Sequence, residues 1–224
     1  MMILEERFTP KEFGHLTAIK ILLLIMTINN DIFPELNHEI IKPLLETEDI
    51  LLWKSWQKYP IQARYLILLF YRYLYLTQTS SYYSNRIENQ EFYLEKLWFF
   101  IFDNLLIYDI EEEEILSQVI INLIQEFFTE ENIIFPDTNN CHFDFQLRYL
   151  PLKYYLEKSL EKLTPIERII LVTKDKFVWE DDKILQYLQQ QKKKITLPEI
   201  KAFYTKAHSQ LLNNLPTDIV SIYL

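Results

Sequence analysis

Few residues in this chain have the types and spacing that metal binding or catalysis requires. Glu35 and His38 share the Glu-x-x-His spacing of helical di-iron proteins, whose sites also need a second such pair and two further glutamates. Cys141, His142 and Asp144 lie close together, but two or three ligands hold a metal only with help from elsewhere in the chain. No serine or cysteine has a recognisable base partner. The sequence therefore predicts no catalytic residues, no metal site and no cofactor.

Glycine and cysteine are almost absent: Gly14 and Cys141 are the only examples. Phosphate-cradling loops, dinucleotide-binding fingerprints and nucleophile elbows need glycine where the backbone turns sharply or approaches a ligand closely. The sequence therefore excludes the enzyme classes built on such loops, and we expect a protein that is not an enzyme. A single cysteine also excludes a disulfide framework within the chain, which is typical of a reducing compartment.

The apolar segments of the chain are too short to cross a membrane. Residues 16–28 and 65–76 are strongly apolar, but they contain Lys20 and Arg72. A bilayer-spanning helix needs about 20 apolar residues, so we expect both segments to be buried helices. The N-terminal residues include two glutamates where a secretory signal would be positively charged. We therefore expect a cytoplasmic protein with no membrane partner.

The charge of the chain is unevenly distributed. Hydrophobic residues make up 49% of the 224 residues, which is enough for a substantial core, and the net charge is −9. Residues 1–150 contain 11 Lys and Arg against 23 Asp and Glu, whereas residues 151–215 contain 12 against 8. Because phosphate groups repel an acidic surface, only the C-terminal part is a candidate for binding nucleic acid.

Helix start and stop signals run along the whole chain and predict an all-α fold. Thr-x-x-Glu capping boxes with a nearby proline occur at 164–167 and 196–199. A Thr-Ser-Ser cluster at 79–81 predicts a break between two aromatic-rich helices, and turn-forming residues at 136–140 predict a linker. We expect three parts: an acidic, aromatic-rich helical domain over residues 1–135, a linker over 136–150, and a smaller basic domain over 151–224.

One sequence pattern lies in the acidic half. A polar, an acidic and an aromatic residue stand in a row and are followed, after four further residues, by a Leu-Trp pair. The five residues of this pattern are Gln90, Glu91, Phe92, Leu97 and Trp98. This pattern resembles the segment with which bacterial σ⁷⁰-family sigma factors bind the RNA polymerase core, especially in the small extracytoplasmic-function-like members. The resemblance covers about residues 60–107 and implies that these five residues bind the polymerase core. The alternative is an ordinary amphipathic core helix whose apolar side chains are buried.

A second pattern lies in the basic half. Residues 163–168 are similar to a helix start in the C-terminal DNA-binding domain of the same family, and residues 200–211 are similar to its recognition helix. The resemblance implies a helix-turn-helix over part of residues 151–215. Five lysines around the second helix and the preceding turn are the predicted DNA-binding residues: Lys192, Lys193, Lys194, Lys201 and Lys206. The alternative is a lysine-rich turn that only contacts solvent.

The chain also departs from the family in a region that matters for function. In sigma factors, basic and aromatic residues after the Leu-Trp pair recognise and open the promoter, but residues 99–131 contain no Lys or Arg. Such a surface repels phosphate. We expect a sigma-factor-like protein that binds the RNA polymerase core and touches promoter DNA through its C-terminal domain. The alternatives are a sigma-derived adaptor that does not open promoters and an unrelated helical interaction protein.

Overall fold

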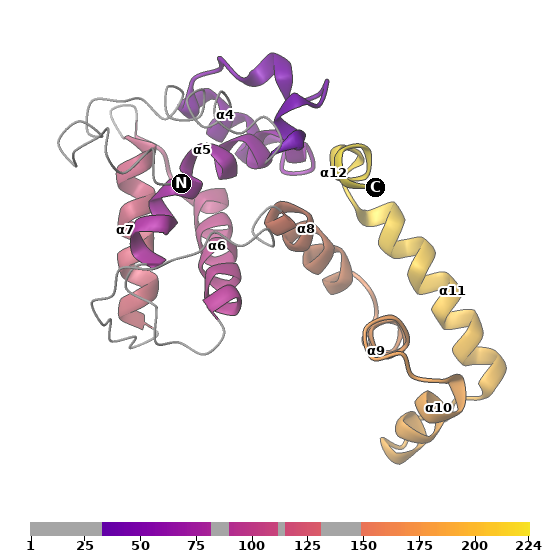
Figure 1. Ribbon diagram of the computed structural model, residues 1–224. Coiled ribbons are helices and arrows are strands. Elements are labelled where there is room, and N and C mark those ends of the chain that lie inside the picture. Colours follow the sequence, from indigo (N-terminus) through magenta and orange to yellow (C-terminus); the bar gives the residue numbers. More distant parts are fainter. Residues whose placement is uncertain (1–32, 82–89, 112–114, 131–148) are drawn as a thin grey trace. The chain divides into compact units, whose positions relative to one another are not determined.

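The protein is helical throughout the part that the computed structural model describes, which comprises residues 33–81, 90–111, 115–130 and 149–224. Within these ranges the chain forms nine α-helices, α4 to α12, and no strand (Figure 1). Two short 3-10 helices, η1 (Pro34–Asn37) and η2 (Lys42–Leu44), precede α4. The predicted all-α fold is therefore confirmed for these residues.

The chain divides into two compact units. Unit 1 comprises Met1–Pro151 together with Ser221–Leu224, and unit 2 comprises Leu152–Val220. The predicted linker at 136–150 lies outside the described residues except for its last two positions. The predicted domain boundary therefore stays a prediction, and each unit is described by itself below.

In the described residues, unit 1 is built around four helices with a core rich in aromatic residues. The helices are α4 (Asp49–Lys58), α5 (Ala63–Ser81), α6 (Gln90–Ile107) and α7 (Leu116–Glu130), and α5 packs against both α4 and α7. The rings of Phe70 and Trp98 meet edge to face with centroids 4.8 Å apart, and Phe102 lies 5.5 Å from Trp98. Such pairs stabilise a core by roughly 0.5–1.5 kcal/mol each beyond burial. The apolar segment 65–76 is thus a core helix, as expected from its length.

One helix end in unit 1 lies slightly later than the sequence predicts. Helix α5 includes the Thr-Ser-Ser cluster 79–81 and ends at Ser81, and residues 82–89 lie outside the described residues, so a break directly after this cluster stays a prediction. Hydroxyl side chains can bond to a carbonyl of the preceding turn and so remain within a helix. Thr77 does this earlier in α5, where its hydroxyl donates to the Leu74 carbonyl at 2.8 Å.

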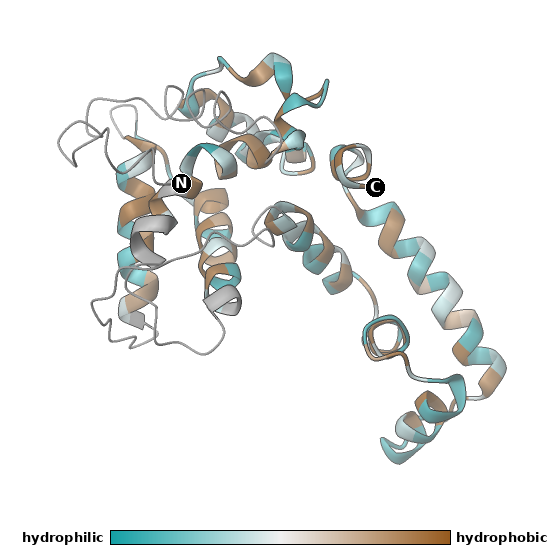
Figure 2. Ribbon diagram, viewed as in Figure 1, coloured by the Kyte–Doolittle hydropathy of each residue, from teal (hydrophilic) through white to brown (hydrophobic). Residues whose placement is uncertain are grey.

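Unit 2 is smaller and contains a compact arrangement of three helices after α8 (Leu150–Glu161). These are α9 (Pro165–Asp175), α10 (Asp181–Gln190) and α11 (Leu197–Asn214), and each of them packs against the other two. Helix α12 (Thr217–Tyr223) follows. Polar and apolar residues alternate around α11 in Figure 2, as expected for a helix with one buried face. One apolar cluster joins the three helices: Ile170, Ile184, Leu188, Ile195 and Ile200.

Both predicted capping boxes are present in unit 2. The backbone N–H and the hydroxyl of Thr164 donate to Glu167 at the start of α9, at 3.0 and 2.6 Å. Thr196 makes the same two bonds to Glu199 at the start of α11, at 2.8 and 2.7 Å. The Thr196 bonds also hold the pKa of the Glu199 carboxyl below its ordinary value. Because a capping box involves residues only three positions apart, it fixes where each helix begins.

Of the helices in the described ranges, none combines the length and the apolar character that a membrane crossing requires.

Candidate functional site

The turn between α10 and α11 presents three consecutive lysines to solvent. Lys192, Lys193 and Lys194 are all exposed, whereas the next residue, Ile195, is buried and only 6% exposed. The N–H of Lys192 donates to the Gln189 carbonyl at 2.9 Å, and that of Lys193 donates to the Leu188 carbonyl at 3.0 Å. These two bonds form a Schellman motif, which ends α10. The turn is therefore fixed by the core and by backbone bonds, while its charges point away from the protein.

Lys192 occupies the position of the Schellman motif that normally holds glycine. Its φ is 59°, in the left-handed region that is unfavourable for residues with a Cβ atom. Lysine at this position makes the protein less stable than glycine would. The need to end α10 therefore does not explain why a lysine occurs here.

The outward face of α11 is mainly polar. Lys201, Thr205 and His208 are exposed at helical spacing, while Ile200 and Ala207 on the opposite face are completely buried. In the described part of the chain Lys201 has no ion-pair partner. Lys201 and the lysine turn both lie near the N-terminus of α11. Their positive charges and the partial positive charge of the helix N-terminus attract anions to the same place.

Lys206 is placed differently from the other four lysines. Its ammonium Nζ lies 2.8 Å from Oε1 of Glu167, whose side chain is only 2% exposed. Lys206 thus joins α11 to the start of α9, and its charge is balanced by that carboxylate. The Lys206 bond, followed by the Thr164 hydroxyl, holds the pKa of the Glu167 carboxyl below its ordinary value despite burial. DNA contact by Lys206 stays a prediction.

We expect Lys206→Ala to destabilise the protein by about 1–3 kcal/mol at pH 7, because it leaves the buried Glu167 carboxylate without its cation. Glu167 has a lowered pKa in the folded protein, so its stabilising effect is complete above 4.5 and is lost as the pH falls through the folded pKa. Urea unfolding at pH 7 and pH 3.5 measures both effects. The difference between variant and wild type should shrink at the lower pH.

Lys201→Ala is the matched control for this experiment, because Lys201 lies on the same helix and is exposed. It should leave the free energy of unfolding within about 0.5 kcal/mol of wild type. Equal stability of the two lysine variants at pH 7 would show that the Glu167–Lys206 contact does not hold α11 to α9.

A second contact between α9 and α11 surrounds Tyr204. Its hydroxyl donates to Asp175 at 2.8 Å, and the Lys174 ammonium lies 4.6 Å from the centre of its ring. The Asp175 carboxylate raises the pKa of the Tyr204 hydroxyl, because it bonds the protonated form. Together with the ion pair between Lys206 and Glu167, this contact holds α11 in its orientation against α9.

The predicted polymerase-binding residues lie at the start and in the middle of α6. Helix α6 begins at Gln90, and the side chains of residues 90–92 lie outside the described part of the structure. Leu97 and Trp98 are each only 1% exposed, so they belong to the core of unit 1. The alternative interpretation, an amphipathic core helix, predicts that these two side chains are buried. Polymerase binding by this segment stays a prediction, and the buried side chains of Leu97 and Trp98 offer almost no surface for it.

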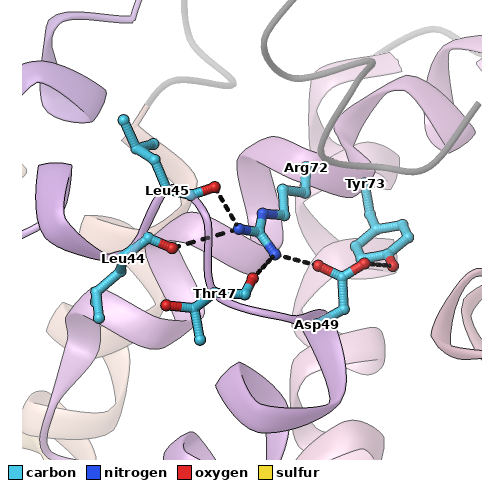
Figure 3. Close-up of polar contacts among 6 residues, drawn as sticks. All are labelled: Leu44, Leu45, Thr47, Asp49, Arg72 and Tyr73. Carbon is cyan, nitrogen blue, oxygen red and sulfur yellow. Dashed lines mark hydrogen bonds and ion pairs between the residues drawn. The ribbon is translucent and has the colours of Figure 1, made fainter.

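A buried arginine organises the other end of unit 1. Arg72 on α5 is fully buried, and its guanidinium donates to the carbonyls of Thr47, Leu45 and Leu44 at 2.7, 2.9 and 3.4 Å (Figure 3). It also forms an ion pair with Asp49, whose second oxygen accepts from the Tyr73 hydroxyl. Figure 3 shows the guanidinium between the chain before α4 and the Asp49 carboxylate. This arrangement satisfies backbone carbonyls rather than presenting a charge to a ligand.

The candidate metal ligands are not brought together in the described ranges. Glu35 lies in η1 and is 3% exposed, and His38 directly follows that helix. The sequence does contain a second Glu-x-x-His pair, Glu12 and His15, so the lack of such a pair does not support the prediction of no metal site. This pair and the cluster at 141–144 lie outside the described residues. Within the ranges that are described, no group of three or more His, Cys, Asp or Glu side chains could hold a metal ion.

Comparison with known proteins gives no relative from which a role could be transferred: no protein-family model, no curated protein and no solved structure matches this chain. The functional argument therefore depends on the residues and contacts described above.

Proposed function

We propose that this chain is a sigma-factor-like transcription protein, which acts by binding rather than by catalysis. In this proposal α10 and α11 are the two helices of a helix-turn-helix, and α11 with the lysine turn before it contacts duplex DNA. The start of α6 contacts the RNA polymerase core. The observation that carries the DNA-binding part is the exposure of Lys192, Lys193 and Lys194 on a turn held by the buried Ile195.

The packing around α11 supports the same proposal. A recognition helix must be held firmly from behind while its outer face stays accessible. Ile200 and Ala207 anchor the inner face of α11, and Tyr204 and Lys206 bond to α9. The outer face carries small and polar side chains that fit a groove, among them Lys201 and Thr205.

A second candidate function is a sigma-derived adaptor that binds polymerase or DNA without opening promoters. The absence of Lys and Arg from residues 99–131 favours it, because strand opening by this part of the chain would require cations that meet phosphates. A promoter-opening assay with the polymerase core separates the two functions: only the sigma-like function gives an open complex.

Salt-dependent DNA binding tests the DNA part of the proposal. We expect the full chain to bind duplex DNA weakly, because its net charge of −9 repels phosphates. The affinity should fall as the salt concentration rises, because lysine–phosphate contacts release counterions from the DNA. The double variant Lys193→Ala/Lys194→Ala should reduce the slope of log K against log salt by roughly 1.8, which is about 0.9 for each phosphate that the protein no longer neutralises. Fluorescence anisotropy of a labelled duplex at several salt concentrations measures the slope.

Lys162→Ala/Lys176→Ala is the matched control, because both lysines are exposed in unit 2 but lie outside the turn and α11. This variant removes the same charge and should keep the wild-type slope. Equal slopes for the two double variants would mean that binding depends on charge alone. In that case, or if no salt-dependent binding is seen, the lysine turn is a solvent-exposed surface and not a DNA contact.

A further inference from the structure

His208 lies on the outward face of α11, in line with Lys201, and both side chains are exposed. The two residues are seven positions apart, which on a helix is about 20° short of two full turns and about 10 Å along the axis. Lys206 lies between them in the sequence, but it is rotated by about 140° from Lys201 and is paired with Glu167. His208 is therefore the next side chain after Lys201 on this face of α11 that can carry a positive charge.

The imidazole ring of His208 rests against a tyrosine whose own position is fixed. The ring centroids of Tyr204 and His208 are 6.1 Å apart. The Tyr204 hydroxyl donates to Asp175, and the Lys174 ammonium lies 4.6 Å from the centre of the Tyr204 ring. Within the described residues the ring nitrogens of His208 form no hydrogen bond. The ring is thus supported at the surface of α11, while its nitrogen atoms are not used by this part of the chain.

The charged groups that reach α11 from α9 already have partners. They are Lys174, Asp175 and Glu167, and their partners are Asp181, Tyr204 and Lys206 respectively. Helices α8 and α10 contribute apolar side chains to the clusters beneath α11. In the described ranges no carboxylate bonds to the imidazole of His208. A proton gained by this ring therefore adds a positive charge to the outward face that no contact within unit 2 cancels.

We propose that His208 is a further DNA contact of α11, which binds a phosphate when its ring is protonated. This inference rests on the proposed function, because it needs α11 to face a duplex. Histidine is the side chain that ordinarily gains its charge between about pH 8 and pH 5, whereas lysine ordinarily stays charged over this range. The distance of about 10 Å along α11 exceeds the axial spacing of phosphates on a DNA strand, so His208 and Lys201 meet different phosphates. The affinity for DNA therefore rises as the pH falls through this range.

Fluorescence anisotropy of a labelled duplex with the full chain, at several salt concentrations and at about pH 8 and pH 6, tests this inference. For the wild type, the slope of log K against log salt should steepen by roughly 0.9 at the lower pH, which corresponds to one additional phosphate contact. His208→Gln should keep the wild-type slope of pH 8 at both pH values. His208→Lys carries a charge at both pH values and should show the steeper slope at both.

His38→Asn is the matched control, since it removes a titrating ring that follows η1 in unit 1 and is not part of α11. It should keep the wild-type change of slope. An equal change of slope in the wild type and His208→Gln overturns the inference, because the effect then comes from the charge of the whole chain. Salt-dependent binding with one slope at both pH values also overturns it, but leaves the lysine contact in place. If no salt-dependent binding occurs at either pH, the proposed DNA contact fails as well.

Discussion

Replacing Arg72 with methionine is expected to lower the free energy of unfolding of unit 1 by about 3–5 kcal/mol. Methionine fills a similar volume but donates no hydrogen bond. It therefore leaves the carbonyls of Leu45 and Thr47 and the carboxylate of Asp49 without the guanidinium. Each unsatisfied buried group costs about 1–3 kcal/mol, and Asp49 is 21% exposed, so water replaces the guanidinium only in part.

Tryptophan fluorescence during urea unfolding measures this effect, because Trp53, Trp56 and Trp98 belong to unit 1 and only Trp179 belongs to unit 2. Lys54→Met is the control, since Lys54 lies on α4 and is exposed. It should change the free energy by less than about 0.5 kcal/mol. A decrease of under 1 kcal/mol in Arg72→Met would contradict the role assigned to the guanidinium.

The features that the sequence predicted correctly are local ones. Thr164 and Glu167, like Thr196 and Glu199, are three residues apart, so their capping interaction depends only on the helix that they begin. The core helix at 65–76 was also predictable, because its apolar run is too short for a membrane and contains Arg72. The end of α5 was predicted only approximately, because hydroxyl residues have a weak preference against the helix, and α5 includes residues 79–81 before it ends at Ser81.

The contacts that position the candidate site were not predictable in the same way. Lys206 and Glu167 belong to different helices, and their pairing follows from how α9 packs on α11. Five positions along a helix correspond to a rotation of about 140°, so the sequence indicates that Lys201 and Lys206 face different directions, but it does not identify Glu167 as the partner of Lys206. The left-handed backbone of Val178, whose φ is 52°, gave no sequence signal either, because this angle depends on how the chain turns between α9 and α10.

Trp98→Ala is the second change for which a large effect is expected, a decrease in stability of about 3–5 kcal/mol. Trp98 is 1% exposed, its ring meets Phe70 edge to face, and its indole N–H donates to the Thr77 hydroxyl at 3.3 Å. Alanine removes the ring and leaves a cavity in the centre of unit 1. Trp98→Phe keeps most of the apolar volume, so urea unfolding should show a decrease of only about 1–2 kcal/mol for it.

These Trp98 variants decide how a polymerase-binding experiment on α6 is to be read. Trp98→Ala should bind the RNA polymerase core poorly because unit 1 is partly unfolded, whereas Trp98→Phe should bind as wild type does, since a side chain that is 1% exposed offers no contact surface. Glu91→Lys, near the start of α6, should weaken core binding in a pull-down while the thermal midpoint stays unchanged. If Glu91→Lys binds as tightly as wild type, the start of α6 is not the polymerase contact.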